Sequence, residues 1–381
     1  MEIVLRELKK ASKKVYESNK KSAIPAKKNA LVVSHELKRG GAPLVLLEMI
    51  DLLLEDYNVT LISIEDGELR DSFLECGIDV LVGNILSYAK CPKGVWHSFD
   101  LVFLNTILTH SFLACFQNTN VPVLWWLHEP ELLFQATYGR CIPFGVLSDN
   151  IRVLPVTRET QQCIRKYYGI QTDILHMGLA DRFSGEFPRE DGKVRFFQPA
   201  KFQQVKGQDI MAQAIIALPA EYMSKTEFYF AGCEDDKNPE YYQLIEKLSV
   251  ALPNVFMLGE RSREEIYDYY QQVDCIVAPS RADATPTTIV EGMMFHKITL
   301  CSNATGISKY LEDGISGYIV ETENVSQLRD KIMYIVDHKE EWDKVKDAGR
   351  SIYLQQFEKN QVKEQLSGII MKMDAGKERG R

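Results

Sequence analysis

The fold is decided by residues 275–302, CIVAPSRADATPTTIVEGMMFHKITLCS. The short apolar run at 275–279 predicts a buried strand, and residues 298–302 predict a second one. Residues 287–295, between them, have the length and spacing of a helix. Apolar strands that alternate with helices are typical of a parallel sheet covered on both faces.

The same alternation continues on both sides of this segment. Further strands are expected at 30–34, 58–64, 101–105, 121–127, 151–157, 194–199, 227–232, 254–259 and 317–320, with helices between them. A chain of 381 residues is long for one hydrophobic core. We therefore predict an α/β protein with two doubly wound, Rossmann-like domains facing a central cleft.

The polar stretch 178–193, which contains Gly and Pro, predicts the domain boundary. The expected parts are an arm at 1–28, an N-terminal domain at 29–187, a C-terminal domain at 188–355 and a final helix at 356–381. The final helix has the option of crossing back to the N-terminal domain. The arm has nine Lys or Arg and three acidic residues, and residues 2–16 have helical spacing. Packing on the body of the protein is the first interpretation, and contact with anionic lipid is the alternative.

The composition limits the classes of function. A net charge of −8 argues against nucleic acid as a partner. The chain has no run of about 20 apolar residues, and its N-terminus lacks the apolar core of a secretory signal. Its eight cysteines are scattered without a CxxC pair, which favours buried thiols over disulfides or zinc ligands. We expect a cytoplasmic protein, with the inner face of the membrane as a further option.

Two loops carry glycine or lysine where a strand is expected to lead into a helix. Gly40 and Gly41 permit positive φ and close approach, and the amides that open the next helix would face an anion. Lys201 and Lys206 lie five apart in a similar loop, where two cations could stabilise a diphosphate. An ordinary turn and two solvated lysines are the alternatives.

His128 directly follows the apolar strand expected at 121–127. Ligands of open α/β sheets bind beyond the carboxyl ends of the strands, so this position makes His128 a candidate site residue. A structural histidine remains the alternative.

Two carboxylates surround the start of the helix in the opening segment. Asp283 is expected in the loop after the strand, and Glu291 in the first turn of the helix, which Thr287 or Thr288 would cap. Carboxylates and free loop amides suit ligands rich in hydroxyl groups, such as a sugar or a ribose. For Glu291, a favourable charge at a helix N-terminus is the alternative.

Residues 279–321 resemble a known family. They are similar to the carboxylate-x7-carboxylate segment of glycosyltransferase family 4, retaining GT-B enzymes that use nucleotide-sugar donors. KFQQVKG at 201–207, RGGAP at 39–43 and ILHMGLADRF at 174–183 resemble the diphosphate loop, the glycine loop and the interdomain segment of that family. The resemblance covers about residues 29–355 and implies a GT-B fold.

The resemblance also implies an activity and a set of site residues. It implies a metal-independent, hexosyltransferase-like enzyme of bacterial cell-surface polysaccharide or glycoconjugate synthesis, with a nucleotide-sugar donor and a glycan, lipid-linked or protein acceptor. No metal or other cofactor is expected. The implied catalytic residues are His128, Lys201, Lys206 and Asp283, and the implied donor-binding residues are Gly40, Gly41, Ala42, Lys201, Lys206, Thr287, Thr288 and Glu291.

Several residues depart from the family pattern. Asp283 stands where glutamate is commoner, Lys201 replaces the usual arginine, and residues 284–286 replace a glycine-rich stretch. These departures motivate an alternative, a non-catalytic GT-B-fold subunit that supports a partner glycosyltransferase. An NAD-dependent oxidoreductase is disfavoured because neither loop has the GxGxxG pattern.

Overall fold

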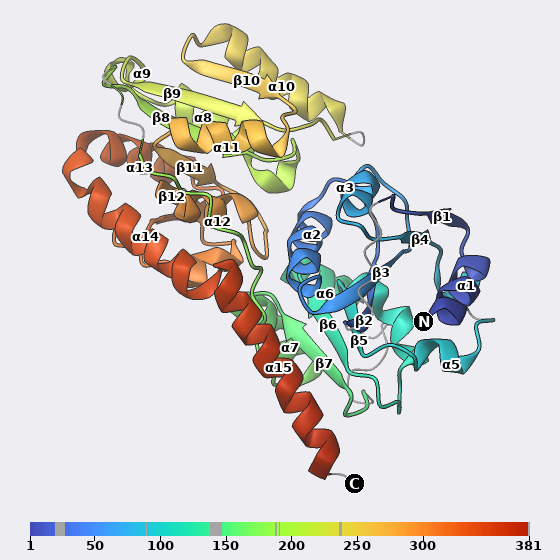
Figure 1. The fold of residues 1–381 in the computed structure, drawn as a ribbon. Helices are drawn as coiled ribbons and strands as arrows, with labels where there is room; N and C mark the ends of the chain where they lie inside the picture. The colour runs from blue at the N-terminus through green and yellow to red at the C-terminus, as the bar shows by residue number, and fades with distance from the viewer. Residues whose placement is uncertain are drawn as a thin grey trace. The chain divides into compact units, whose positions relative to one another are not determined.

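The computed structural model describes residues 1–19, 27–88, 90–137, 147–186, 189, 191–235 and 238–379 (Figure 1). The chain forms an N-terminal unit, Met1–Leu179 with Lys359–Arg381, and a C-terminal unit, Ala180–Glu358. The division after Leu179 precedes the predicted boundary at 187/188, and residues 187 and 188 lie outside the described part. Part of the predicted arm, residues 20–26, also lies outside it.

The described residues of the N-terminal unit contain a seven-stranded sheet in the order β1-β4-β3-β2-β5-β6-β7. Its strands are β1 Lys14–Tyr16, β2 Lys28–Ser34, β3 Tyr57–Ser63, β4 Val80–Val82, β5 Leu101–Asn105, β6 Val123–Leu127 and β7 Ile151–Pro155. All neighbours are parallel except β1, which pairs antiparallel with β4 at the edge. Strands β5 and β6 are wholly buried, as parallel strands between two helical layers must be.

The helices of the N-terminal unit connect and cover this sheet. They are α1 Glu2–Ala11, α2 Gly41–Leu53, α3 Arg70–Glu75, α4 Ile85–Tyr88, α5 Lys93–Trp96, the 3-10 helix η1 Ile107–Cys115, α6 Glu131–Thr137, α7 Arg158–Tyr168 and α15 Lys359–Arg379. The prediction of one helix over 2–16 is wrong beyond Ala11. Ser12 is extended there, and the chain continues into β1, because β4 offers an unpaired edge. Leu8 is fully buried, so α1 packs on the unit.

The C-terminal unit, as far as it is described, contains a six-stranded parallel sheet in the order β10-β9-β8-β11-β12-β13. Its strands are β8 Val194–Pro199, β9 Thr226–Ala231, β10 Val255–Gly259, β11 Cys275–Ala278, β12 Ile298–Ser302 and β13 Tyr318–Val320. The opening segment of the sequence forms β11, a loop, a helix and β12, side by side in the sheet as predicted.

Helices cover both faces of this second sheet (Figure 1). They are α8 Gln208–Ile216, α9 Ala220–Met223, α10 Pro239–Ala251, α11 Arg263–Gln272, α12 Thr287–Met294, α13 Val325–Asp337 and α14 Trp342–Gln356, with the 3-10 helices η3 Gln204–Lys206, η4 Gly306–Lys309 and η5 Lys339–Glu341. Helices α8, α10 and α13 pack together, and α12 packs against α14 and, through aromatic rings, against α11. The prediction of two Rossmann-like domains is confirmed.

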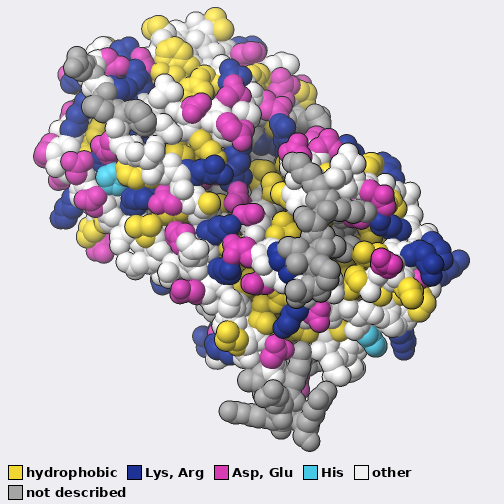
Figure 2. Space-filling view, in the orientation of Figure 1, with side chains coloured by type: hydrophobic (Ala, Val, Ile, Leu, Met, Phe, Trp, Pro, Cys, Tyr) yellow, Lys and Arg dark blue, Asp and Glu magenta, His cyan; other side chains and the backbone are white. Residues whose placement is uncertain are grey.

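Two general features concern the charged side chains of the surface and the length of the helices. On the face drawn in Figure 2, Lys and Arg side chains are interspersed with Asp and Glu side chains. Among the described helices, none is both long enough and apolar enough to cross a bilayer.

Candidate functional site

In the C-terminal unit, the loop between β8 and α8 lies against the end of β11. Gly207 has φ of 72°, and a Cβ added there would lie 2.1 Å from the carbonyl oxygen of Pro279. Val205 accepts a hydrogen bond from the amide of Arg281 at 2.8 Å. The glycine therefore lets the lysine loop approach the loop that contains Asp283.

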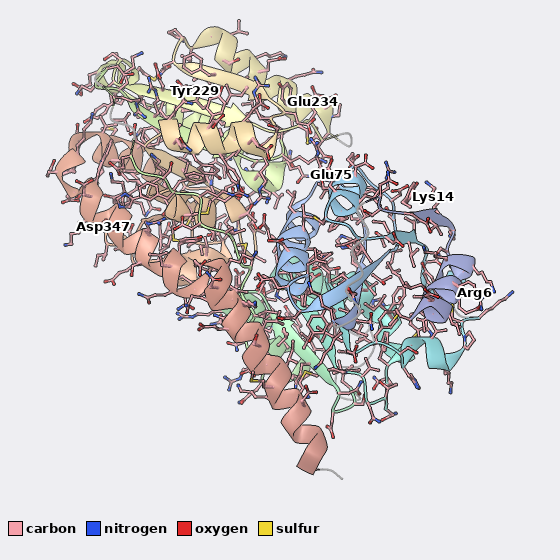
Figure 3. The ribbon with its side chains drawn as sticks, viewed as in Figure 1. Arg6, Lys14, Glu75, Tyr229, Glu234 and Asp347 are labelled. Atoms are coloured by element: carbon pink, nitrogen blue, oxygen red, sulfur yellow. The ribbon has the colours of Figure 1, made fainter. Side chains whose placement is uncertain are left out.

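This approach brings Lys206 and Asp283 together. Lys206 Nζ donates to Asp283 Oδ2 at 2.5 Å, and the carboxylate side chain is 12% exposed. Lys201 pairs instead with Asp235, at 3.4 Å between Nζ and Oδ1. Asp235 follows Glu234, labelled in Figure 3, in the loop after β9. Both predicted lysines thus lie at the carboxyl end of the sheet, each paired with a carboxylate.

Glu291 lies further along its helix than predicted, and it is buried. It was expected in the first turn of its helix, but it is the fifth residue of α12 and is 7% exposed. The interpretation as a charge at a helix N-terminus is therefore weakened, because that effect fades beyond the first turn. Its carboxylate lies 2.9 Å from the Tyr270 hydroxyl and 3.3 Å from Arg263 Nη2.

The start of α12 differs from the prediction. Pro286, not a threonine, occupies the N-cap position, and neither Thr287 nor Thr288 caps the helix with its side chain. Thr287 and Thr288 are the first two helical residues, whose amides have no acceptor inside an α-helix. Ile289 donates its amide to the Pro286 carbonyl at 3.1 Å. The backbone at 287 and 288 can therefore serve as a donor pair for a ligand.

The glycine loop of the N-terminal unit does not use positive φ. Gly40 caps α2 with φ of −160°, and Gly41 is its first helical residue, so the expected left-handed backbone is absent at both of these described positions. A Cβ on Gly41 would meet no described atom within 4 Å, which leaves the helix start accessible within its unit. The carbonyl of Ala42 accepts a hydrogen bond from Asn105 Nδ2 at 3.3 Å.

His128 lies at the end of β6, in contact with the end of β5. Its Nε2 is 2.9 Å from Asn105 Oδ1, and its ring centroid is 4.1 Å from that of Trp126. Burial, with a smaller effect of His35, lowers the pKa of His128 to about 3. The ring is therefore neutral near pH 7 in this environment.

The carboxylate next to His128 was not predicted to be a site residue. Glu129 is 4% exposed and accepts the amides of Ile107 at 2.6 Å and of His128 at 2.9 Å. It joins the loops after β5 and β6. In the first of these loops, directly after β5, Thr106 has φ of 74°, a strained value for a β-branched residue, of the kind that clusters at functional sites.

Other contact residues were also missed. Tyr270 and Arg263 on α11 reach Glu291, Asp235 reaches Lys201, and Asn105 reaches His128. Asn105 ends an apolar strand, so the rule that singled out His128 also indicates it. Nothing in the spacing of the helix 263–273 indicates that Tyr270 meets a residue 21 positions later.

Two family models match the chain. The model described as Glycosyl-transferase family 4 matches residues 26–178, and the model described as Glycosyl transferases group 1 matches residues 181–352. The chain belongs to glycosyltransferase family 4.

Relatives of this family 4 protein include an uncharacterized glycosyltransferase of Methanocaldococcus jannaschii, 28% identical over 36% of the chain and 37% of that protein. A putative glycosyltransferase, EpsD, of Bacillus subtilis is 23% identical over 77% of the chain and 75% of that protein. The match to the first of these therefore spans little more than a third of its length.

Solved structures share the fold of the family 4 chain. HepE of Anabaena, in complex with UDP and glucose, is 16% identical with a TM-score of 0.75, over 90% of this chain and 99% of that one. WaaG, a glycosyltransferase involved in lipopolysaccharide biosynthesis, is 13% identical with a TM-score of 0.67, over 90% and 99%. At these identities the likeness establishes the GT-B fold.

Proposed function

We propose that the protein transfers a sugar from a nucleotide-diphosphate sugar to an acceptor hydroxyl. The observation that carries the proposal is the Lys206–Asp283 pair, with the first amides of α12 in the same loop. It combines a cation for a phosphate, a carboxylate for sugar hydroxyls and backbone donors. The donor site then belongs to the C-terminal unit, and the acceptor is assigned to the N-terminal unit, where His128 would meet the sugar.

The lysines supply the electrostatic part of the reaction. An ion pair at 4 Å is worth about 4 kcal/mol at an effective dielectric near 20, so Lys201 and Lys206 could stabilise the departing diphosphate appreciably. A bound diphosphate would compete with Asp283 and Asp235 for these ammonium groups. We propose that Asp283 then turns to a hydroxyl of the transferred sugar.

We propose retention of configuration because of the resemblance to family 4, and the residues bear only on the route by which it would occur. In the proposed complex Asp283 bonds to a hydroxyl of the transferred sugar and Glu291 is buried in α12, so neither is assigned as a nucleophile. In the proposed step the acceptor oxygen attacks the anomeric carbon of the sugar from the same face that the diphosphate leaves. The bond from the anomeric carbon to the phosphate oxygen breaks, the bond to the acceptor oxygen forms, and the leaving oxygen takes the acceptor's proton.

The donor and acceptor classes follow from relatives only as proposals. HepE was solved with UDP-glucose, which makes UDP-sugars the first donors to test. Relatives include an uncharacterized protein of a Klebsiella pneumoniae cps region, and this supports a glycan or lipid-linked acceptor in bacterial surface polysaccharide synthesis. No metal is required in this scheme, so chelation with EDTA should leave turnover unchanged.

We also propose that the N-terminal unit touches a membrane from the cytoplasmic side. Helix α1 carries Arg6, labelled in Figure 3, and contacts α4. Ile3 on α1 is 69% exposed and Leu86 on α4 is 79% exposed. Replacing both with serine should reduce binding to vesicles that contain anionic lipid, because the apolar anchor is lost while buried Leu8 stays in place. Equal binding of the variant and the native protein would remove this proposal.

Release of nucleotide from UDP-, GDP-, ADP- and dTDP-sugars, with acceptor extracts, tests the main proposal. Lys206→Ala should lower kcat/KM by about 100-fold, as expected for loss of a group that stabilises the leaving charge. Lys344→Ala, a change at an exposed lysine of α14, is the matched control and should have no effect. Native activity in Lys206→Ala contradicts the proposal. Nucleotide binding without turnover of any donor favours the non-catalytic subunit.

A further inference from the structure

The carboxylate of Glu291 is held from two sides by residues of α11. The hydroxyl of Tyr270 lies 2.9 Å from Glu291 Oε2 and 3.2 Å from the carbonyl oxygen of Thr288. Arg263 Nη2 lies 3.3 Å from Glu291 Oε1. Each carboxylate oxygen therefore meets a donor from α11, and together these donors restrict rotation of the carboxylate plane.

Tyr270 is well suited to act as the fixed partner. It is fully buried, and its ring stacks on Phe295 with centroids 5.2 Å apart and an interplanar angle of 1°. Phe197 contacts it edge-on, with centroids 5.8 Å apart. Burial, followed by the nearby Glu291 carboxylate, raises the pKa of Tyr270 well above 10, so its hydroxyl keeps the proton that it donates.

Arg263 is the more exposed of the two partners, and its Nε also donates to the Tyr267 hydroxyl. Its side chain is 30% exposed, compared with 9% for Glu291, and its guanidinium carbon lies 5.3 Å from the centroid of the Tyr267 ring. A guanidinium at the surface loses less interaction free energy when it moves than a buried hydroxyl does, because water can replace its hydrogen bonds. Of these two contacts, the one from Tyr270 is therefore the buried one, and we take it as the contact to test.

We propose that Tyr270 is a positioning residue, which orients Glu291 to accept the ribose hydroxyls of the donor and so makes the site selective for ribonucleoside over deoxyribonucleoside diphosphates. This inference rests on the proposed donor site. A carboxylate has about four acceptor positions, so Glu291 can receive ribose hydroxyls in addition to Tyr270. A deoxy ligand leaves this buried acceptor less well satisfied, and sites built in this way discriminate strongly against the missing hydroxyl.

The test compares UDP with dUDP, and GDP with dGDP, by calorimetric titration of the full-length protein. The native protein should bind the ribonucleotide of the preferred base more tightly than its deoxy form. Tyr270→Phe removes one hydroxyl and should weaken ribonucleotide binding by about 10-fold, while deoxynucleotide binding changes less than about 2-fold. Tyr269→Phe, on the same helix and half-buried, is the matched control and should change neither affinity.

The ratio of ribo to deoxy affinity within one variant is independent of how much protein is folded. Equal weakening of both nucleotides by Tyr270→Phe, or an unchanged ribonucleotide affinity, overturns the inference. Glu291→Ala separates the two proposals. If it weakens UDP binding and Tyr270→Phe does not, only the role of Tyr270 fails. If Glu291→Ala binds UDP like the native protein, or if no nucleotide binds the native protein, the donor site itself fails and the inference with it.

Discussion

Glu129 shows how one buried side chain can join the loops after two neighbouring strands, β5 and β6. Its carboxylate accepts amides from Ile107 and His128, and within the described residues no salt bridge to it is present. Burial raises the pKa of Glu129 to about 7, although the amides favour the charged form. A buried carboxylate whose hydrogen bonds come only from backbone amides takes up a proton at a higher pH than an exposed carboxylate does.

This pKa predicts a pH dependence of stability. The folded-state pKa lies above the reference value of 4.5, so between pH 4.5 and about 7 the folded state holds more proton than the unfolded state. The contribution of Glu129 to the free energy of unfolding is then greatest below pH 4.5 and is lost as pH rises through 7, by on the order of 3 kcal/mol. Glu129→Gln should flatten this decline.

Denaturant unfolding at pH 5 and pH 8 measures the effect. Tryptophan fluorescence reports mainly on the N-terminal unit, because Trp96, Trp125 and Trp126 lie there and Trp342 does not. Glu131→Gln is the control, since its carboxylate pairs with Lys166 and the pKa of Glu131 is lowered by that contact. The same pH slope in Glu129→Gln and in the native protein would show that Glu129 does not titrate in this range.

At the scale of elements, Gly207 controls how the lysine loop meets β11. Its φ of 72° disfavours side chains, and an added Cβ would lie 2.1 Å from the backbone oxygen of Pro279. Gly207→Ala should therefore displace the loop, destabilise the C-terminal unit by about 3 kcal/mol or more, and weaken nucleotide binding. Thermal unfolding and calorimetry measure the two effects.

A matched glycine separates backbone strain from collision. Gly314 has φ of 77°, and a Cβ added there would meet no described atom within 4 Å. Gly314→Ala should cost only the left-handed strain, about 1–2 kcal/mol, and leave nucleotide binding unchanged. Equal losses for the two variants would mean that contact with Pro279 contributes nothing.

The elements that were predicted well are those with strong local patterns. The strands at 101–105, 194–199 and 298–302 have the predicted bounds, because each is a buried run between turn residues. Strands β1 and β4 were missed, since three residues carry too little periodicity and β1 exists only through its pairing with a distant edge. The N-cap at Pro286 was missed because threonines nearby are statistically better caps.

The candidate site was predictable only in part, because local sequence patterns indicate strand positions but not the partners of a side chain. Lys206 and Asp283 lie in the segments that follow two neighbouring strands, β8 and β11, so the sheet order brings them together. Position on a strand does not determine side-chain partners such as Tyr270 or Asp235, which depend on how helices and loops pack. Gly41 was expected to permit positive φ and close backbone approach, but it is the first residue of helix α2.

At the scale of the whole molecule, the chain order and the structural units do not coincide. Helix α15 follows the C-terminal unit in sequence but belongs to the N-terminal unit. Val362, Leu366, Ile369 and Met373 are buried there, and Lys359 Nζ pairs with Asp51 on α2 at 2.6 Å. The final segment therefore completes the N-terminal core, whereas Lys201, Lys206, Tyr270, Asp283 and Glu291 all lie within Ala180–Glu358.

This division predicts that the two units differ when they are expressed separately. The fragment 180–358 should fold and bind the nucleoside diphosphate, because it contains the whole proposed donor site. The fragment 1–179 should aggregate or bind the dye ANS, since four buried side chains of α15 are missing, each worth about 1.5–3 kcal/mol as an upper estimate.

The structure also indicates how to restore the N-terminal unit. The amide of Lys359 lies 3.1 Å from the carbonyl oxygen of Leu179, so residues 1–179 can be joined to 359–381 through a short Gly-Ser linker. This fusion should give a monomer with a cooperative thermal transition that the fragment 1–179 lacks. If the short fragment unfolds as cooperatively as the fusion, α15 is not part of the core. Conversely, loss of nucleotide binding in the fragment 180–358 would mean that the donor site needs residues from the N-terminal unit.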